Sequence, residues 1–497
     1  MPQKPKLLLI TPPYHAGVVE AAGSWPHIGF VYVAGHVRAA GFDVEIYDAM
    51  TKGHTIQQIK ERITLSNPDI VGSTAYTSSI NDAMEVLRTA KEVNPQIITL
   101  IGGIHANFCY EELLRGYPET LDIVVRGEGE VTVPELMEVL VGVPRLADGR
   151  DFPSDTGLSK VLGIVYREDR KVRVNPPRPF VEDLDSLIPA WDLVDWADYS
   201  FYVMPGSRLG IVNSSRGCVN ECSFCSQQKF WHRSYRERKP EKFVEELEYL
   251  RDTYRVNVVM LSDEYATRNG ERWEKILDLM IERQTGVYLL LETCVGDIIR
   301  DADIMWKYKK AGVLHIYVGV EATSQDKLDH FKKNIACEHS REAIRLINEA
   351  GMLTECSFVL GMPDDEPGHI EETLALAKHY NPDFAHFLLI APWPYADIYD
   401  ELKEHVEEKD YSKYNFVEPV VRPKNMTMEE ISRAVIDCYR RYYMDKIKEY
   451  DTIRDEFKRD YLLRSMKVMM ENSFLVRHLT GMGDIPDEVR KYLEQKN

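Results

Sequence analysis

The 497-residue sequence lacks any long hydrophobic run. Its first apolar stretch, Leu7 to Ile10, is far too short to span a bilayer and leads directly into Thr-Pro-Pro. Basic residues are also fewer than acidic residues: the sequence contains 61 Lys and Arg and 80 Asp and Glu, which gives a formal net charge of -19. Phosphate backbones are bound by clustered basic residues. We therefore expect no transmembrane segment and no nucleic-acid partner.

Cysteine is scarce and unevenly distributed. Of eight cysteines, five stand alone in the sequence: Cys109, Cys294, Cys337, Cys356 and Cys438. Such scattering excludes the disulfide framework of a small secreted protein and predicts a reducing, cytoplasmic location.

The other three cysteines, Cys218, Cys222 and Cys225, form a C-x3-C-x2-C triplet just after an apolar segment. Three thiolates can hold a [4Fe–4S] cluster and leave one iron free to chelate a small molecule. The alternatives are a zinc knuckle or a disulfide, but zinc usually takes four protein ligands in two close pairs. His232 is nearby, yet the run lacks a second C-x2-C. The triplet therefore predicts an iron–sulfur cluster with an open iron.

Residues 1–142 alternate short β-rich runs with stretches of helical periodicity, which predicts an α/β fold with a doubly wound parallel sheet. The expected strands are Lys6 to Ile10, Asp43 to Tyr47, Asp69 to Ser73, Ile97 to Ile101 and Asp122 to Val125. Ligands of such sheets bind at the carboxyl ends of the strands. Those ends carry this domain's unusual residues: Thr11, Pro12, Tyr14, His15, Ser73, Thr74, Gly102, Gly103, Ile104 and Glu128.

Residues 143–200, rich in Pro and Asp, are predicted to be a strap between domains with one strand-like run near Gly163 to Tyr166. Residues 201–400 contain six evenly spaced strand candidates: Leu209 to Asn213, Val256 to Leu261, Val287 to Glu292, Val313 to Gly319, Thr354 to Leu360 and Phe384 to Ile390. Six such units suit a partial (β/α)6 barrel with its chemistry at the carboxyl ends of the strands. Residues 401–497 are predicted to be mostly helical, and their aromatic and Met residues are either core or a lid over an apolar substrate.

Acidic residues follow several of the predicted barrel strands. Asp263 and Glu264 follow the second strand, Glu292 ends the third, and Glu321 follows the fourth within Gly-Val-Glu. Each could serve the site, or could simply occupy a helix N-terminus where negative charge is favoured. For Glu292 we favour the structural interpretation.

The cysteine triplet, with Phe224 before its third cysteine, resembles the signature of the radical S-adenosylmethionine (SAM) superfamily. The resemblance implies that the open iron binds the amino and carboxylate groups of SAM. Reduction by a donor such as flavodoxin or ferredoxin would then yield a 5′-deoxyadenosyl radical. It further implies SAM contacts by Phe224, by Asp263 or Glu264 at the ammonium group, by Glu321, and by the backbone at Gly361.

The N-terminal domain resembles the cobalamin-binding domain of many radical SAM enzymes, chiefly in Gly102-Gly-Ile-His-Ala106 and Arg126-Gly-Glu-Gly-Glu130. This resemblance assigns the ten strand-end residues above to cobalamin. His15 lacks the D-x-H-x-x-G context of a cobalt-ligating histidine, and the near match Asp48 to Gly53 follows the second strand instead of the first. We therefore expect cobalamin without a histidine ligand, and some relatives bind none.

The chain as a whole is similar to the anaerobic magnesium-protoporphyrin IX monomethyl ester oxidative cyclases. The matching motifs are Gly23-x-Trp-Pro26, Cys222-Ser-Phe-Cys-Ser-Gln227, Pro392-Trp-Pro394, Lys413-Tyr-Asn-Phe-Val417 and Tyr439-Arg-Arg-Tyr-Tyr-Met444. The similarity implies a small tetrapyrrole substrate and cobalamin-assisted oxidative cyclisation. Asp263 to Arg268 departs from the expected pattern, which leaves the substrate open. The alternatives are a cobalamin-dependent C-methyltransferase, a cobalamin-free dehydratase or epimerase, and a non-enzymatic iron–sulfur or cobalamin sensor.

Overall fold

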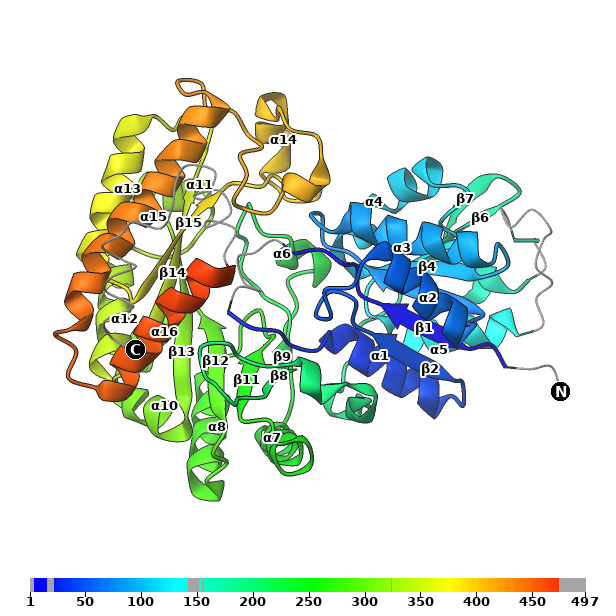
Figure 1. Ribbon diagram of the computed structural model, residues 1–497, viewed down its shortest axis with the longest axis horizontal. Helices are drawn as coiled ribbons and strands as arrows, with labels where there is room; N and C mark the ends of the chain where they lie inside the picture. Colours follow the sequence, from blue (N-terminus) through cyan, green and yellow to red (C-terminus); the bar gives the residue numbers. More distant parts are fainter. Residues whose placement is uncertain (1–3, 16–21, 142–151, 154–155, 323, 473–497) are drawn as a thin grey trace. The chain divides into compact units, whose positions relative to one another are not determined.

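The structure, a computed structural model, describes residues 4–15, 22–141, 152–153, 156–322 and 324–472 (Figure 1). The chain forms two compact units. Unit 1 comprises residues 1–15 and 26–198, and unit 2 comprises residues 16–25 and 199–497. The sequence predicted four segments, divided near residues 142, 200 and 400. In the structure the strap belongs to unit 1, and the C-terminal helices belong to unit 2.

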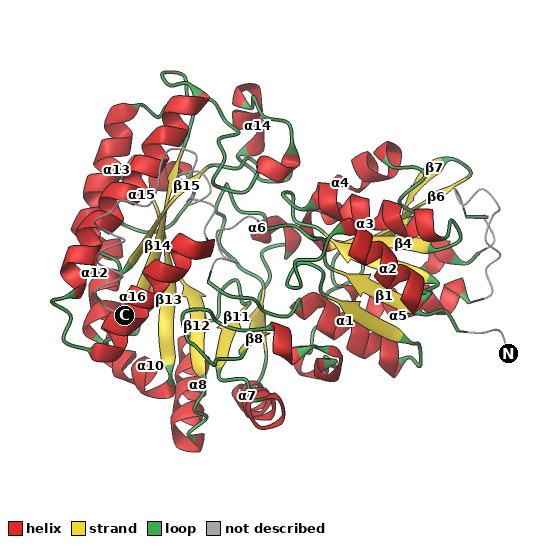
Figure 2. Cartoon of the chain, in the orientation of Figure 1, coloured by secondary structure: helices red, strands yellow, loops and turns green. Residues whose placement is uncertain are grey.

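Unit 1 is built on a seven-stranded sheet of order β2-β1-β3-β4-β5-β6-β7. Strands β1 to β5 are parallel and span Leu7–Ile10, Val44–Tyr47, Ile70–Thr74, Ile98–Gly102 and Ile123–Val125. All four residues of β1 are buried, as expected for a central parallel strand covered on both faces. The helices are α1 (Ile28–Ala39), α2 (Ile56–Ser66), α3 (Ile80–Val93), α4 (Gly103–Gly116) and α5 (Gly129–Leu140). Helices α1 and α5 pack together, as do α2 and α3 (Figure 2), so the predicted doubly wound sheet is confirmed.

The predicted strap contains two strands instead of one. β6 (Ile164–Glu168) and β7 (Lys171–Val174) form an antiparallel hairpin that extends the sheet beyond β5. The turn residues Asp169 and Arg170 both have positive φ, +50° and +63°. This turn normally carries Asn-Gly or Asp-Gly. Because Arg170 stands where such a turn usually has glycine, the sequence contains no hairpin signal at this position. The prediction of a strap with one strand was therefore wrong.

Unit 2 contains a six-stranded parallel sheet of order β15-β14-β13-β12-β11-β8. The strands are β8 (Leu209–Val212), β11 (Val258–Leu261), β12 (Tyr288–Thr293), β13 (Val313–Glu321), β14 (Leu353–Leu360) and β15 (Phe384–Leu389). All six overlap the predicted strands. Since β8 and β15 pair with only one strand each among the described residues, the sheet is open, which confirms the predicted partial barrel.

Helices connect and cover the strands of unit 2. They are α6 (Gln227–Phe230), α7 (Pro240–Tyr254), α8 (Gly270–Arg283), α9 (Val295–Arg300), α10 (Met305–Ala311), α11 (Gln325–His330), α12 (Cys337–Glu349), α13 (Pro367–Tyr380), α14 (Tyr399–Leu402), α15 (Met428–Tyr450) and α16 (Glu456–Asn472). Across the described residues, no helix combines the length and apolarity needed to cross a membrane.

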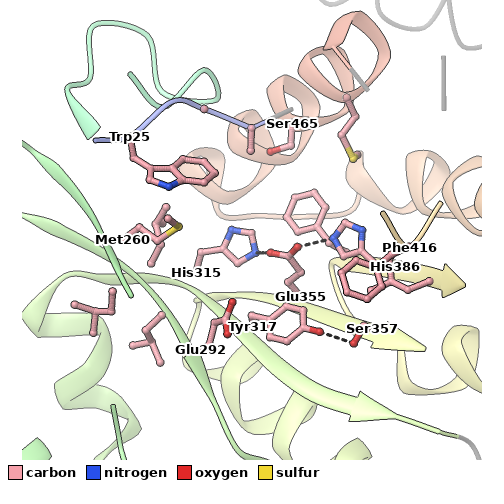
Figure 3. A pocket seen from close by; sticks show the side chains of 18 of the residues that line it. Trp25, Met260, Glu292, His315, Tyr317, Glu355, Ser357, His386, Phe416 and Ser465 are labelled. Carbon is pink, nitrogen blue, oxygen red and sulfur yellow. Dashed lines mark hydrogen bonds and ion pairs between the residues drawn. The ribbon is translucent and has the colours of Figure 1, made fainter. Parts of the chain in front are cut away.

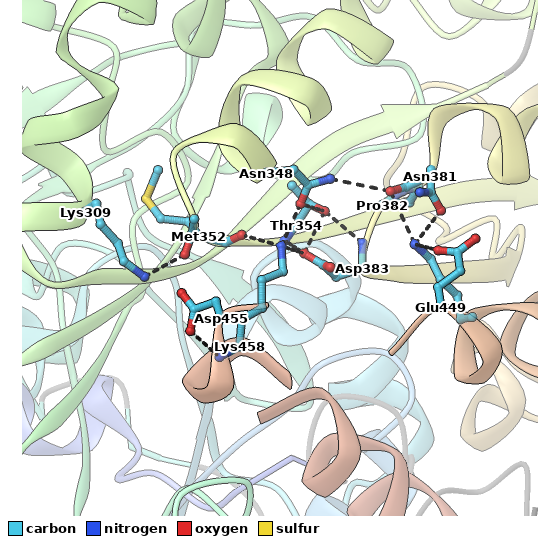
Figure 4. Close-up of polar contacts among 12 residues, drawn as sticks. Lys309, Asn348, Met352, Thr354, Asn381, Pro382, Asp383, Glu449, Asp455 and Lys458 are labelled. Atoms are coloured by element: carbon cyan, nitrogen blue, oxygen red, sulfur yellow. Dashed lines mark hydrogen bonds and ion pairs between the residues drawn. The ribbon is translucent and has the colours of Figure 1, made fainter. Parts of the chain in front are cut away.

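The C-terminal helices are fastened to the sheet by buried groups. Helix α15 packs on α13 and β15, where the Tyr443 hydroxyl donates to the Ala385 carbonyl at 3.2 Å. On α16, Lys458 forms an ion pair with Asp383 at 2.8 Å and donates to the Met352 carbonyl at 3.0 Å (Figure 4). Tyr443 is therefore a core residue, which is one of the two alternatives that the sequence left open.

Candidate active site

The loop that carries the three cysteines begins directly after β8 and is closed at its base by a short hairpin. β9 (Ser215–Arg216) pairs antiparallel with β10 (Arg236–Glu237). Gly217, with φ of +97°, follows β9, and a Cβ atom there would lie 2.2 Å from the carbonyl oxygen of Ser234. Only glycine fits this close approach. The hairpin and Gly217 together fix the position of Cys218.

The three cysteines are free thiols, and the loop folds them toward one another. The Cys225 N–H donates to the Cys222 carbonyl at 3.1 Å, and the Gln227 N–H donates to Cys225 Sγ at 3.4 Å. Burial, with a smaller contribution from the neighbouring thiols, raises the pKa of Cys218 to about 11 and that of Cys225 to about 12. Ligation must therefore displace a proton from each thiol.

This donor set fits a [4Fe–4S] cluster. In the described part of the chain, no three His, Cys, Asp or Glu side chains surround a single ion position. A cubane cluster does not require such an arrangement, because each cysteine binds a different iron.

The two acids after β11 brace the cluster loop. Asp263 is 3% exposed; its Oδ2 accepts the Ser214 N–H at 2.7 Å, and its Oδ1 accepts the hydroxyls of Ser214 and Ser215 at 2.7 and 2.5 Å. Glu264 Oε2 accepts the Gly217 N–H at 2.9 Å, and its Oε1 accepts the Trp231 indole N–H at 2.7 Å. All four carboxylate oxygens are thus engaged by the loop, whereas the sequence predicted that one of these acids pairs with the SAM ammonium group.

A buried cation lies between the cysteines and Glu321. Lys333 donates to Glu321 Oε1 at 2.9 Å, and Ser357 donates to Glu321 Oε2 at 3.0 Å. Burial alone would lower the pKa of Lys333, but Glu321 and the thiols of Cys222 and Cys294 raise it above its usual range. Lys333 therefore stays charged. Neither Lys333 nor Cys294 could be singled out from the sequence, because a lone lysine or cysteine in a loop carries no distinguishing pattern.

Phe224 and Gly361 occupy different surroundings. The Phe224 ring packs edge-on against Phe331, with ring centres 5.3 Å apart, and it lines the cavity described next. Gly361 follows β14 with φ of +85°, and its N–H donates to Asp365 at 2.8 Å. Its conformation is a glycine turn at the carboxyl end of the strand, where the resemblance implied a backbone contact with SAM.

Figure 3 shows a cavity inside unit 2, with a volume of about 590 Å³. Its lining includes Phe224 and Cys225 on the cluster loop. Its volume falls within the range of ligand pockets. The walls are mainly apolar and aromatic, and include Trp25, Phe201, Met260, Phe384, Trp393, Phe416 and Tyr461. Trp25 comes from residues 22–25, which belong to unit 2, where Gly23 forms an antiparallel bridge with Phe201.

A cluster of titratable residues from three neighbouring strands faces the cavity. Glu355 on β14 lies between His315 on β13 and His386 on β15 (Figure 3), with Nε2 to carboxylate distances of 2.9 and 2.5 Å. Burial alone would raise the pKa of Glu355, but the two imidazoles lower it well below its usual range. Glu355 is therefore ionised.

Glu292, on β12, also lines this cavity. The Glu292 side chain is accessible from the cavity, but protein atoms surround the carboxyl group. This burial, and after it the negative charges of Glu355, Glu264 and Glu321, raises the pKa of Glu292 to about 7. Glu292 was expected from the sequence to have a structural role, but it lies at the cavity wall.

At the sheet of unit 1, the loops after β1 and β2 are bound to each other. The Thr11 hydroxyl donates to Asp48 at 2.8 Å and accepts the Met50 N–H at 3.1 Å. His15 Nε2 lies 2.8 Å from the Met50 carbonyl oxygen, and His15 is exposed. The Asp48 to Gly53 segment, which nearly matches a cobalt-ligating motif, thus holds the loop after β1.

The loops after β3 and β4 meet at Gly103. With φ of +87°, Gly103 begins α4, and a Cβ atom there would lie 2.7 Å from both the Ala75 carbonyl oxygen and Thr74 Oγ1. Gly103 is exposed, and Gly102 and Thr74 are partly exposed. These glycines leave room for a ligand to approach the backbone closely.

The other predicted cobalamin contacts differ in accessibility. The Ser73 hydroxyl donates to the Ile10 carbonyl at 2.9 Å, and Glu128 Oε2 accepts the Val181 N–H at 2.7 Å, so both bind the protein itself. Pro12 and Ile104 are buried, whereas Tyr14 is partly exposed.

Two family models match the chain. The B12 binding domain matches residues 14–137, and the Radical SAM superfamily matches residues 212–377. The first lies mainly in unit 1 and the second in unit 2.

Curated relatives extend over most of the chain. It is 39% identical over 472 residues to the anaerobic magnesium-protoporphyrin IX monomethyl ester cyclase of Rubrivivax gelatinosus, covering 94% of this chain and 83% of that protein. It is 30% identical to an uncharacterised methyltransferase of Pyrococcus horikoshii, covering 88% of this chain and 92% of that protein.

Among solved structures, the radical SAM methyltransferase TsrM from Kitasatospora setae, with cobalamin and a [4Fe–4S] cluster bound, has a TM-score of 0.67. The identity is 16%, with 88% of this chain and 89% of that chain covered. At this identity the likeness concerns the fold.

Proposed function

Because the chain belongs to the family of anaerobic magnesium-protoporphyrin IX monomethyl ester cyclases, which are radical SAM enzymes, we propose that it cyclises such a tetrapyrrole oxidatively. The observation that carries the proposal is the apolar cavity, which reaches the cluster loop and is lined with titratable side chains.

Three cofactors are implied, and each has candidate residues. Cys218, Cys222 and Cys225 would hold the [4Fe–4S] cluster. When bound, the cluster and SAM supply a hydrogen-abstracting 5′-deoxyadenosyl radical, and cobalamin supplies a further carrier of single electrons. For SAM we retain Phe224 and Glu321, because both line the cavity.

Gly361 completes the proposed SAM site through its turn after β14. Asp263 and Glu264 are assigned a positioning role, because the loop engages all their oxygens. They hold the cysteines in place for the cluster.

For cobalamin we propose contact with the accessible residues of unit 1, namely Tyr14, Thr74, Gly102 and Gly103. Thr11, Ser73 and Glu128 bind other groups of unit 1 and would support the residues that contact cobalamin. The bond of His15 to Met50 supports our expectation that this histidine does not ligate cobalt.

The residues that line the cavity would assist oxidation of a substrate carbon in two ways, by excluding water and by transferring a proton. Its aromatic walls exclude bulk water from the reacting carbon. Glu292, with a pKa near 7, can release or take up a proton at working pH when water adds and a ketone forms.

The test is product analysis. Anaerobically reconstituted enzyme with SAM, a reductant and magnesium-protoporphyrin IX monomethyl ester should form 5′-deoxyadenosine and a product with the new ring. In heavy-oxygen water the ketone should carry the label. Formation of 5′-deoxyadenosine without any change to the tetrapyrrole would refute the proposed substrate.

Methyl transfer is the second candidate, because the Pyrococcus relative and the TsrM fold are those of methyltransferases. It would give S-adenosylhomocysteine beside 5′-deoxyadenosine and a product heavier by one methyl group. Oxidative cyclisation gives neither.

We further propose a reducing cytoplasmic setting with a low-potential donor such as flavodoxin or ferredoxin. All eight cysteines are free, which supports that setting.

A further inference from the structure

The Glu355 cluster is built into the sheet. Side chains alternate between the two faces of a strand, and Ser357 lies beside His386 in the register of β14 and β15. His315 and Tyr317 on β13, Glu355 and Ser357 on β14, and His386 on β15 all line the cavity. Rigid strands hold these side chains in place, as a precise binding site requires.

The two histidines differ in what their second nitrogen contacts. His315 Nδ1 lies 3.1 Å from the Tyr461 hydroxyl, and its Nε2 lies 2.9 Å from Glu355 Oε2, an ion-pair contact without hydrogen-bond geometry. His386 uses only Nε2, which lies 2.5 Å from Glu355. Its Nδ1 has no hydrogen-bond partner among the described residues.

The contact with Glu355 sets the proton on His386. An ionised carboxylate can only accept a hydrogen bond, so Nε2 of His386 must carry a proton. In the neutral imidazole the lone pair then resides on Nδ1. A carboxylate behind an imidazole is the usual support of a metal-ligating histidine, because it fixes the tautomer and raises the basicity.

We propose that Nδ1 of His386 is the axial ligand to the central metal of a metallotetrapyrrole bound in this cavity, with Glu355 as its positioning residue. Four pyrrole nitrogens fill the metal's equatorial plane, so a protein reaches the metal only along its axis. The aromatic side chains of Trp25, Trp393 and Phe416 supply apolar area for a flat macrocycle.

This inference rests on the proposed function, since it takes a tetrapyrrole as substrate, but it adds a requirement for the metal. It predicts that the site distinguishes metallated from metal-free tetrapyrroles. The ligation occurs on binding and involves no bond cleavage or electron transfer.

The test is a binding titration of the reconstituted full-length enzyme without SAM or reductant, so that no turnover occurs. Magnesium-protoporphyrin IX monomethyl ester should bind with a red-shifted Soret band. His386→Gln should remove the shift and weaken binding about tenfold or more, whereas the metal-free ester should bind both proteins equally. Glu355→Gln should also weaken binding of the metallated ester about tenfold.

Two further variants separate ligation from folding. His315→Gln, the matched control on the other side of Glu355, should retain the Soret shift. His386→Gly should lose it and regain it when free imidazole is added.

The outcomes separate this inference from the proposed function. An unchanged Soret band and affinity in His386→Gln would overturn the axial-ligand assignment, even if cyclisation proceeds. Absence of binding of either ester to the wild-type enzyme would overturn the tetrapyrrole substrate itself.

Discussion

Replacing Asp263 by alanine should loosen the cluster loop far more than replacing it by asparagine. In Asp263→Ala, the N–H of the fully buried Ser214 loses its acceptor, which costs about 2 kcal/mol. The hydroxyls of Ser214 and Ser215 can turn to other acceptors and lose about 1 kcal/mol together. Loss of the charge near Arg272 adds about 1 kcal/mol. The total is about 4 kcal/mol.

Asp263→Asn keeps most of these contacts. Its amide oxygen can accept the Ser214 N–H, and its NH2 can donate to the two hydroxyl oxygens. Only the charge near Arg272 is lost, so the cost is about 1 kcal/mol. Burial raises the pKa of Asp263, which means that a neutral side chain is tolerated at this position.

Amide hydrogen exchange of a peptide covering residues 213–218 measures the opening of the loop. About 4 kcal/mol corresponds to roughly 1000-fold faster exchange in Asp263→Ala, and about 1 kcal/mol to roughly fivefold in Asp263→Asn. Iron content after reconstitution should fall in the same order. Glu245→Ala, which removes an exposed ion pair with Lys242 at 2.8 Å, is the control and should leave this peptide unchanged. Equal exchange in the alanine and asparagine variants would refute the assigned role of Asp263.

Three other predictions follow from the site. Replacing Cys218 by alanine should abolish the brown colour and 5′-deoxyadenosine formation, and retained turnover would contradict its assignment as a ligand. The pKa of Glu292 is about 7 in the folded protein, against an ordinary value of 4.5. Between pH 4.5 and 7 the folded protein therefore binds a proton that the unfolded chain has released. The free energy of unfolding should consequently fall as the pH rises through this range. Thermal unfolding of Glu292→Gln should show a flatter pH dependence, and an unchanged dependence would count against the cavity setting of Glu292. Gly103→Ala should lower the melting temperature and the cobalamin affinity more than Gly53→Ala. Both glycines have positive φ, but only at Gly103 would a Cβ atom meet other atoms. Equal effects of the two substitutions would show that backbone strain alone is the cause.

The features that were predicted correctly are those whose pattern lies within a short stretch of sequence. The six barrel strands are short apolar runs between helical stretches, and the cysteine spacing lies within eight residues. The matched family models and relatives confirm the expected cobalamin-binding and radical SAM domains and the resemblance to the cyclases. The same matches confirm an enzyme class in place of a sensor.

The missed features depend on contacts between distant segments. His315, Glu355 and His386 lie on three different strands, and each alone in an apolar run resembles a core residue. The sequence does contain a usable signal for this cluster. Polar residues stand two positions apart at His315 and Tyr317 and again at Glu355 and Ser357, and residues two apart lie on the same face of a strand. The contacts of Asp263 and Glu264 with the cluster loop could not be predicted, since a strand-end acid gives no indication of which loop it will bind.

The short segment that brings Trp25 to the cavity has a consequence for domain exchange. Residues 22–25 belong to unit 2 whereas residues 26–198 belong to unit 1, so the catalytic unit is not contiguous in sequence. A fragment beginning at residue 199 would lack one wall of its own cavity. A chimaera that takes residues 1–198 from a relative would also import that relative's residues at positions 22–25 of the cavity wall, whereas exchange of residues 26–198 alone would leave this wall unchanged.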